Sequence, residues 1–181
     1  MKLIYLIGAP GSGKTTALRS ALIELGWPTP TQVEKPIPHL NYLQGRIQLG
    51  RDRGGGFSGT DALGMAINPK AIEYITTLPA NIIIAEGDRL TNNPFFAAAK
   101  NCSDFTIIHL ATRPATARER ARLRSLHHNT PQQSESWWKG RYTKIDNILI
   151  GRRHIILNGD NTPDRIATQL AEIIATRTTR L

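Results

Sequence analysis

The sequence predicts an α/β fold, a three-layer sandwich built around a mainly parallel five-stranded sheet. Short apolar runs that are typical of buried strands alternate along the chain with segments of helical periodicity. Hydrophobic residues make up 40% of the 181 residues, which is enough for a packed core. Because the sequence contains no internal repeat or domain-separating linker, we expect a single domain over residues 1–181. The strands are expected at 2–7, near 31–34, and at 81–85, 105–111 and 153–158.

Apolar periodicity and end signals place the helices. The first has its apolar residues on one side and ends at Gly26. Helices are expected at 14–25, near 60–61, and at 69–78, 93–100, 114–126, 135–149 and 163–176. Residues 28–45 are rich in proline and polar residues, so we expect mainly loop there. The stretch 45–59 is rich in glycine and arginine. A flexible linker would not need Arg53 and Phe57, so we predict a functional loop in which these two residues contact the substrate.

The net charge of +9 suggests a polyanionic partner, most often a nucleic acid, although some small proteins are simply basic. Cys102 is the one cysteine, which excludes an intramolecular disulfide and a cysteine-based metal cluster. A reducing, cytoplasmic location is therefore the default expectation. The apolar run at residues 3–7 is too short for a signal-peptide core or a membrane span, so we expect no membrane association.

The strongest motif follows the first strand. Residues 8–15 match G-x-x-x-x-G-K-[ST], with a buried strand before them and a helix after them. Backbone N–H groups of such a loop, together with the helix N-terminus, bind the phosphates of ATP or GTP. Lys14 is expected to reach the β- and γ-phosphates and act in catalysis, and Thr15 to coordinate Mg²⁺. The predicted nucleotide-binding residues are Gly8, Ala9, Pro10, Gly11, Ser12, Gly13, Lys14, Thr15 and Thr16.

Three carboxylates are candidates for the chemistry beside the loop. Glu86 ends an apolar strand whose carboxyl end should lie next to the phosphate loop, so it is expected to contact the Mg²⁺ through water. Asp88 lies two residues further on and is a candidate to share this site. The alternative for both Asp88 and Glu86 is a role as a turn residue. Asp61 is a candidate general base for an attacking hydroxyl, but an Asp in a first helical turn is favourable through the helix dipole alone. Asp88 is the rival base.

The segment from Pro114 to Leu126 is a helix dense in arginine. Arg118 and Arg122 share one helical face, and Arg120 and Arg124 share another. The segment resembles the mobile lid of small P-loop kinases, whose arginines neutralise charge on the transferred phosphoryl group, and we select Arg118 and Arg122 for this role. The alternative is a solvated basic face.

The next helix interleaves aromatic residues with cations, from Trp137 to Lys144. This composition suits stacking on bases while backbone phosphates are held, and Trp137 is the candidate for substrate contact. Packing in the core is the alternative, and we expect one of Trp137 and Trp138 to be buried and the other partly exposed. A histidine metal site is not expected, because only His127 and His128 are adjacent.

These features together resemble the small nucleoside and nucleotide kinases of the P-loop class. The resemblance rests on the phosphate loop, the strand ending in Glu86-Gly87-Asp88, the arginine helix and the segment Leu157-Asn158-Gly159-Asp160. It covers nearly the whole chain. It implies a lid at about residues 113–140 and places the segment 158–162 near the adenine.

A narrower resemblance rests on residues 54–63, Gly-Gly-Gly-Phe-Ser-Gly-Thr-Asp-Ala-Leu. This segment is similar to phage-encoded kinases that act on 5-hydroxymethyluracil within DNA during thymine hypermodification. The resemblance implies ATP with Mg²⁺ as cofactors, DNA containing 5-hydroxymethyluracil as partner, and the cytoplasm of an infected bacterium as location. A base modified inside duplex DNA must be flipped out or already exposed. A small-molecule nucleoside or nucleotide kinase and a DNA-binding NTPase without a phosphoryl acceptor remain the alternatives.

Overall fold

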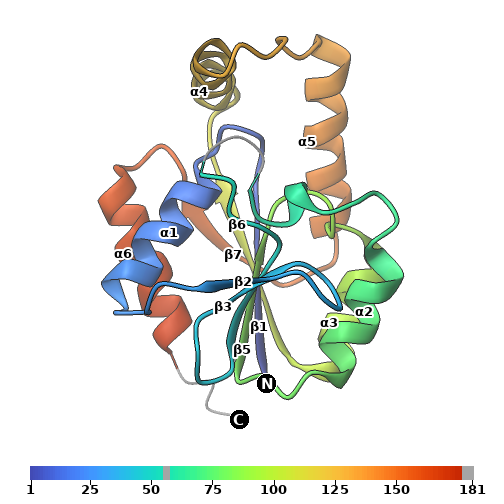
Figure 1. Ribbon diagram of the computed structural model, residues 1–181. Coiled ribbons are helices and arrows are strands. Elements are labelled where there is room, and N and C mark those ends of the chain that lie inside the picture. Colours follow the sequence, from blue (N-terminus) through green and yellow to red (C-terminus); the bar gives the residue numbers. More distant parts are fainter. Residues whose placement is uncertain (55–57, 177–181) are drawn as a thin grey trace.

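The computed structural model describes residues 1–54 and 58–176, which form a seven-stranded sheet covered by helices on both faces (Figure 1). The strand order is β2-β3-β4-β5-β1-β6-β7. The strands are β1 (Lys2–Ile7), β2 (Thr31–Val33), β3 (His39–Asn41), β4 (Arg46–Leu49), β5 (Ile82–Glu86), β6 (Asp104–Ala111) and β7 (Ile155–Asn158). Five of them, from β4 to β7 in the sheet order, pair in parallel, while β2 and β3 add antiparallel pairs at one edge. The predicted α/β sandwich is thus confirmed.

The predicted strand count was too low, because β3 and β4 lie in segments expected to be loop. In β4, Ile47 and Leu49 face the core while Gln48 is buried on the other face. Gln48 tolerates burial because its Oε1 accepts a hydrogen bond from the Tyr42 hydroxyl (2.9 Å). The alternation of a strand was therefore present, but a polar residue on the second buried face and the flanking glycines and arginines obscured it.

The helices are α1 (Lys14–Glu24), α2 (Asn68–Thr77), α3 (Asn93–Cys102), α4 (Pro114–His127), α5 (Glu135–Leu149) and α6 (Pro163–Ala175), with the short 3₁₀-helix η1 (Thr60–Ala62). These agree with the predicted positions. Proline in the first turn begins α2, α3, α4 and α6, and side-chain caps from Asn92, Ser134 and Thr162 begin α3, α5 and α6. No helix in the described part of the chain has the length and apolar character needed to cross a membrane.

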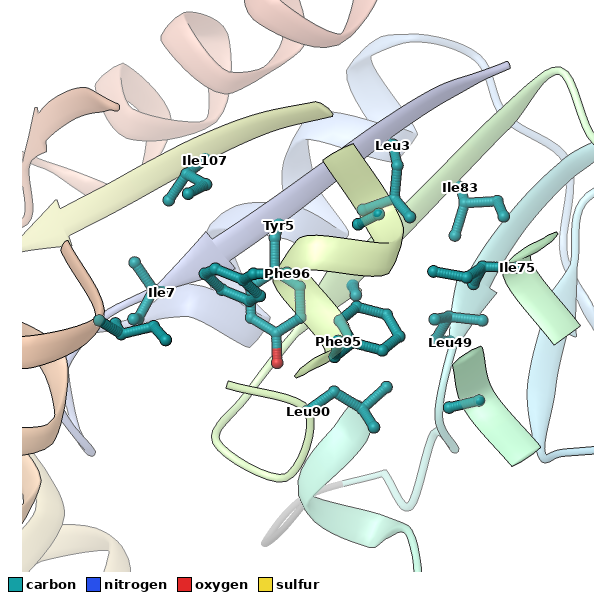
Figure 2. Close-up of a cluster of buried hydrophobic side chains, with 14 of the residues drawn as sticks. Leu3, Tyr5, Ile7, Leu49, Ile75, Ile83, Leu90, Phe95, Phe96 and Ile107 are labelled. Atoms are coloured by element: carbon teal, nitrogen blue, oxygen red, sulfur yellow. The ribbon is translucent and has the colours of Figure 1, made fainter. Parts of the chain in front are cut away.

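Two cores lie on opposite faces of β1, because successive side chains of a strand point to opposite sides. Leu3, Tyr5 and Ile7 pack with α2 and α3, whereas Ile4 and Leu6 pack with α1 and α6. Figure 2 shows Phe95 and Phe96 of α3 against the ring of Tyr5. Burying each such aromatic side chain contributes about 1.5–3 kcal/mol.

Helices α4 and α5 differ from the other four because they rise beyond the carboxyl ends of the strands (Figure 1). The last turns of α5 return to the core, where Ile145, Ile148 and Leu149 pack in the same cluster as Phe95 and Phe96. The sheet thus presents the loops after β1, β4 and β5 at one end, directly below α4 and α5.

Candidate active site

The phosphate loop connects β1 to α1 and has the geometry that the motif predicts. Gly11 and Gly13 have positive φ angles of 78° and 95°, which place them in the region where only glycine is unstrained. The Lys14 ammonium lies against the loop and donates to the carbonyl oxygens of Gly8 (2.8 Å) and Ala9 (3.0 Å). Burial lowers the pKa of Lys14, and the charge of Glu86 partly opposes that effect. The ammonium is thus positioned beside a loop of N–H groups that suits phosphate.

Thr15 and Glu86 meet at the mouth of this loop. The Thr15 hydroxyl donates to Oε1 of Glu86 (2.9 Å), which joins the start of α1 to the end of β5. Glu86 is only 1% exposed, and burial raises its pKa to about 7, with the charge of Lys14 acting in the opposite direction. A hydroxyl and a buried carboxylate are hard oxygen ligands, and a nearby cation would relieve the cost of burying the carboxylate charge. The pair therefore fits Mg²⁺, to which a protein usually supplies few ligands because phosphates and water complete the shell.

Two glycines bring the segment after β4 against the end of β5. A Cβ atom on Gly59 would overlap the Glu86 carboxylate, and one on Gly87 would lie 2.7 Å from the Thr60 hydroxyl oxygen. The backbone N–H of Asp88 donates to Oδ1 of Asp61 (2.7 Å). Asp61 is thereby fixed beside the β5 turn, close to Glu86.

A buried hydrogen-bond network holds the turn after β5, and sequence reasoning missed it. The Tyr5 hydroxyl donates to the Gly87 carbonyl (3.0 Å), and the Thr91 hydroxyl donates to the same oxygen (2.8 Å). Tyr5 is fully buried, and this burial raises the pKa of its hydroxyl. The only signal in the sequence was a hydroxyl-bearing residue in the middle of an otherwise aliphatic strand. The network fixes the backbone that holds Glu86 and Asp61 together.

Asp88 has different surroundings, although it was a rival candidate for the base. Its carboxylate forms ion pairs with Arg141 and with Lys144 (2.8 Å to Lys144), both on α5. The Lys144 ammonium also donates to the Asp88 carbonyl (3.0 Å). Asp88 therefore connects the β5 turn to α5, whereas Asp61 forms no ion pair with the residues in the described ranges.

The arginines of α4 point in different directions. Arg118 pairs with Glu135 (2.6 Å) and lies over the ring of Trp138, and Arg122 pairs with Glu119 on the exposed side. Arg120 instead points toward the phosphate loop: one of its guanidinium nitrogens lies 4.0 Å from where a Cβ on Gly13 would be, and it donates to the Gly159 carbonyl (3.0 Å).

The structure therefore brings the second arginine face, rather than the one selected from the sequence, to the nucleotide site. Arg124 shares the face of Arg120, and its positive charge lowers the pKa values of both Lys14 and Glu86. Helical spacing alone gave two equivalent faces. Glu119, three residues before Arg122, was the signal that could have assigned Arg122 to a local surface pair.

A model of the P-loop nucleotide kinase 3 family matches residues 1–174 of the sequence. The chain belongs to this family. Among solved structures, a shikimate kinase from Acinetobacter baumannii in complex with shikimate is 16% identical, with 99% of this chain and 96% of that one covered and a TM-score of 0.55. An unliganded sugar kinase from Janibacter sp. HTCC2649 is 12% identical, with 97% and 96% covered and a TM-score of 0.52.

A shikimate kinase from Aquifex aeolicus is 16% identical, with 94% of each chain covered and a TM-score of 0.51. At these identities the likeness shows the fold, which is that of small P-loop kinases. A comparison with curated proteins gave no match.

Two of the three predicted substrate residues, Arg53 and Trp137, lie in the part of the chain that the structure describes. Trp137 is half-buried on α5, perpendicular to the buried Trp138, and the Arg141 guanidinium lies over its ring. Arg53 donates from its side chain to the carbonyl of Ala62, the residue after Asp61 (3.4 Å). Phe57 lies outside the described residues. Thr16, predicted to bind nucleotide, is exposed in the first turn of α1.

Proposed function

We propose that the chain is an ATP-dependent kinase that phosphorylates the hydroxymethyl group of 5-hydroxymethyluracil in DNA. The position of Asp61 is the observation that supports a hydroxyl group as the acceptor of the phosphoryl group. Its carboxylate is held by the Asp88 N–H beside the pair of Glu86 and Thr15, at the mouth of the phosphate loop. A carboxylate at this place can accept the proton of a hydroxyl that attacks the γ-phosphate.

The proposed reaction uses the residues around the loop in separate roles. The loop N–H groups bind the phosphates of ATP, and Lys14 interacts with the β- and γ-phosphates. Thr15 and Glu86 would hold Mg²⁺, which when bound neutralises phosphate charge. The hydroxymethyl oxygen forms a bond to the γ-phosphorus, its proton passes to Asp61, and the bond to the ADP oxygen breaks. The products are ADP and a phosphomethyl base.

Helix α4 and the segment after it are proposed as a lid, at about residues 113–140 of a single domain. Ala117 already packs on the loop, since a Cβ on Gly11 would overlap the Ala117 carbonyl. Arg120 and Arg124, rather than Arg122, would then stabilise the charge on the transferred phosphoryl group.

The distribution of charge supports DNA as the acceptor. Residues 113–153 contain ten Lys and Arg against three Asp and Glu, so this segment carries +7 of the chain's +9. It includes α4 and α5, both of which lie at the end of the sheet that holds the phosphate loop (Figure 1). A small neutral acceptor would not require such a field, whereas a nucleic acid backbone benefits from it. Together with the resemblance of residues 54–63, this favours a base in DNA, acted on in the cytoplasm of an infected bacterium.

The deciding experiment follows label from γ-labelled ATP. DNA containing 5-hydroxymethyluracil is expected to become labelled, and thymine DNA is not. Lys14→Ala should abolish the transfer, because the phosphates lose their cationic partner. Labelling of free nucleosides or nucleotides without labelling of DNA would identify a small-molecule kinase instead. ATP hydrolysis that DNA stimulates without any phosphorylated product would identify an NTPase.

A further inference from the structure

A cavity of about 670 Å³ lies between α5 and the turn that begins α3. One wall is a single helical stripe, because its residues recur every three or four positions along α5, from Ser136 through Lys139, Gly140, Thr143 and Lys144 to Asn147. The opposite wall is the segment 91–93. This cavity is separate from the phosphate loop. Lys144 connects it to the turn after β5, because its ammonium contacts both the carboxylate and the carbonyl of Asp88.

The chemistry of the cavity suits an anion with neighbouring polar groups. Two lysines, three asparagines and several hydroxyls line it, while no Asp or Glu does. Its volume is within the range of pockets for small organic ligands and exceeds what a lone phosphate needs. A phosphate carried on a sugar fits both the polar, cationic lining and the volume of the cavity.

Gly140 is the second observation that points to a ligand. It lies in the interior of the fifteen-residue helix α5, where glycine is the poorest ordinary helix former after proline. Nothing in the fold requires it, because a Cβ at this position would meet no atom within 4 Å and its φ is not positive. The glycine instead leaves the middle of the cavity wall without a side chain, which allows a bound molecule to approach the helix closely.

We propose that this cavity binds a phosphate-bearing nucleotide unit of the acceptor DNA strand, adjacent to the base that is phosphorylated. The proposal rests on the proposed function for the identity of the strand. Lys139 binds the phosphate, Lys144 stays paired with Asp88 at the edge of the cavity, and the bare surface at Gly140 receives the sugar. Since Lys144 also holds Asp88, binding here would place the acceptor next to the turn that positions Asp61.

Substitutions at Gly140 separate ligand binding from folding. Gly140→Ala and Gly140→Leu both replace glycine with a better helix former, so each should raise the Tm by about 2 °C. Gly140→Leu fills the cavity and is expected to weaken binding of a short single-stranded oligonucleotide containing 5-hydroxymethyluracil by about tenfold, with a smaller effect for Gly140→Ala. The affinity for ATP should not change. An unchanged oligonucleotide affinity in Gly140→Leu would overturn the proposal.

The phosphate contact has its own matched pair of variants. Lys139→Gln should reduce the slope of log Kd against log salt concentration for the oligonucleotide by about 0.7, the value for one phosphate contact on a single strand. Lys100→Gln removes an exposed lysine of α3 that does not line the cavity, so its slope should match the wild type. Equal slopes for all three proteins would contradict a phosphate contact at Lys139.

The free 5′-monophosphate of hydroxymethyldeoxyuridine is the second probe. Weaker binding of both probes to Gly140→Leu supports a nucleotide phosphate in the cavity, and an effect on the oligonucleotide alone supports DNA as its source. An effect on the mononucleotide alone overturns the DNA strand as the ligand. These affinities are measured without turnover, so a failure of phosphoryl transfer would sink the proposed function while leaving the test of the cavity valid.

Discussion

Asp61 and Asp88 lie side by side at the mouth of the phosphate loop, but the residues around them give the two carboxylates different capacities. Asp88 is neutralised by Arg141 and Lys144, whereas Asp61 accepts a hydrogen bond from the N–H of Asp88 and forms no ion pair within residues 1–54 and 58–176. A base must have a carboxylate oxygen available to the attacking hydroxyl, and both carboxylate oxygens of Asp88 are already engaged by Arg141 and Lys144. Asp61 is therefore the better candidate in this arrangement.

Two isosteric substitutions test this assignment. Asp61→Asn keeps an oxygen that can accept from the Asp88 N–H, so ATP binding should be preserved, while kcat should fall by about 10²–10⁴-fold through loss of the base. Asp88→Asn should change kcat far less. Its main effect should be to weaken the ion pairs that join the turn after β5 to α5. Steady-state kinetics with hydroxymethyluracil DNA measure both effects. Unchanged turnover in Asp61→Asn would exclude it as the base.

Glu86 provides a prediction about pH. Burial raises its pKa from an ordinary value of 4.5 to about 7, so between these values the folded protein binds more protons than the unfolded chain. Its contribution to stability is full below pH 4.5 and is lost as the pH rises through 7. For the protein without nucleotide or Mg²⁺, this amounts to about 2–3 kcal/mol lost between pH 5 and pH 8.

The control is Glu86→Gln, which can still accept the hydrogen bond from Thr15 but does not titrate. The free energy of unfolding, measured by urea titration at both pH values, should fall more in the wild type than in the variant. Parallel pH profiles for the two proteins would show that Glu86 ionises as it does in water.

At the scale of the element, helix α4 shows why the sequence could not select the arginine that lies beside the phosphate loop. Its spacing predicts two arginine faces of equal merit, and the choice between them depends on how α4 docks onto the loop. Docking is set by the close approach of Ala117 to Gly11, a contact between segments about a hundred residues apart. Local pattern carries no information about such a contact.

The two faces of α4 can be compared by mutation. Arg120→Ala is expected to lower kcat by about 10²-fold, because a charge near the transferred phosphoryl group is lost. Arg122→Ala removes an exposed pair with Glu119 and should leave kcat nearly unchanged. Label transfer from ATP measures both, and circular dichroism checks that α4 stays helical. Equal losses in the two variants would argue against the orientation of α4 described above.

Strands and helices differed in how well the sequence predicted them. The aliphatic strands β1, β5 and β6 and all the helices were clear, because each buries a continuous or periodic apolar face. In contrast, β4 carries the buried Gln48, which only the hydroxyl of Tyr42 makes tolerable. The site shows the same difference. The motif pointed to Lys14 and Thr15 and the end of an apolar strand pointed to Glu86, while the network of Tyr5 and Thr91 depends on tertiary contacts.

At the scale of the whole molecule, the fold would place ATP and the proposed acceptor on different sides of the sheet end. The phosphate loop, α1 and the loop after β7 surround one side of the sheet end, and α5 stands on the other side with the face of α2 and α3 (Figure 1). The excess positive charge lies mostly in residues 113–153, which span both sides. The positive charge is therefore concentrated in one segment. We expect it to affect the binding of the acceptor more than the binding of ATP.

This asymmetry predicts how salt acts on the kinetics. If four backbone phosphates of a single-stranded acceptor are contacted, raising monovalent salt from about 50 to 200 mM should increase the KM for DNA by about 50-fold through counterion release. The KM for ATP should change little, because the loop N–H groups and Lys14 bind its phosphates at short range.

A charge variant and its control locate the effect on the molecule. Arg122→Gln lies in the basic segment and should reduce the salt slope, whereas Arg165→Gln removes an exposed arginine of α6, outside the segment, and should not. Both variants lower the net charge by one, so a difference between their slopes reports the position of the charge and not its total. Two results would contradict this prediction: a KM for DNA that does not change with salt concentration, or equal salt slopes in the two variants. Either would mean that the basic segment does not face the acceptor and that its positive charge serves a different partner.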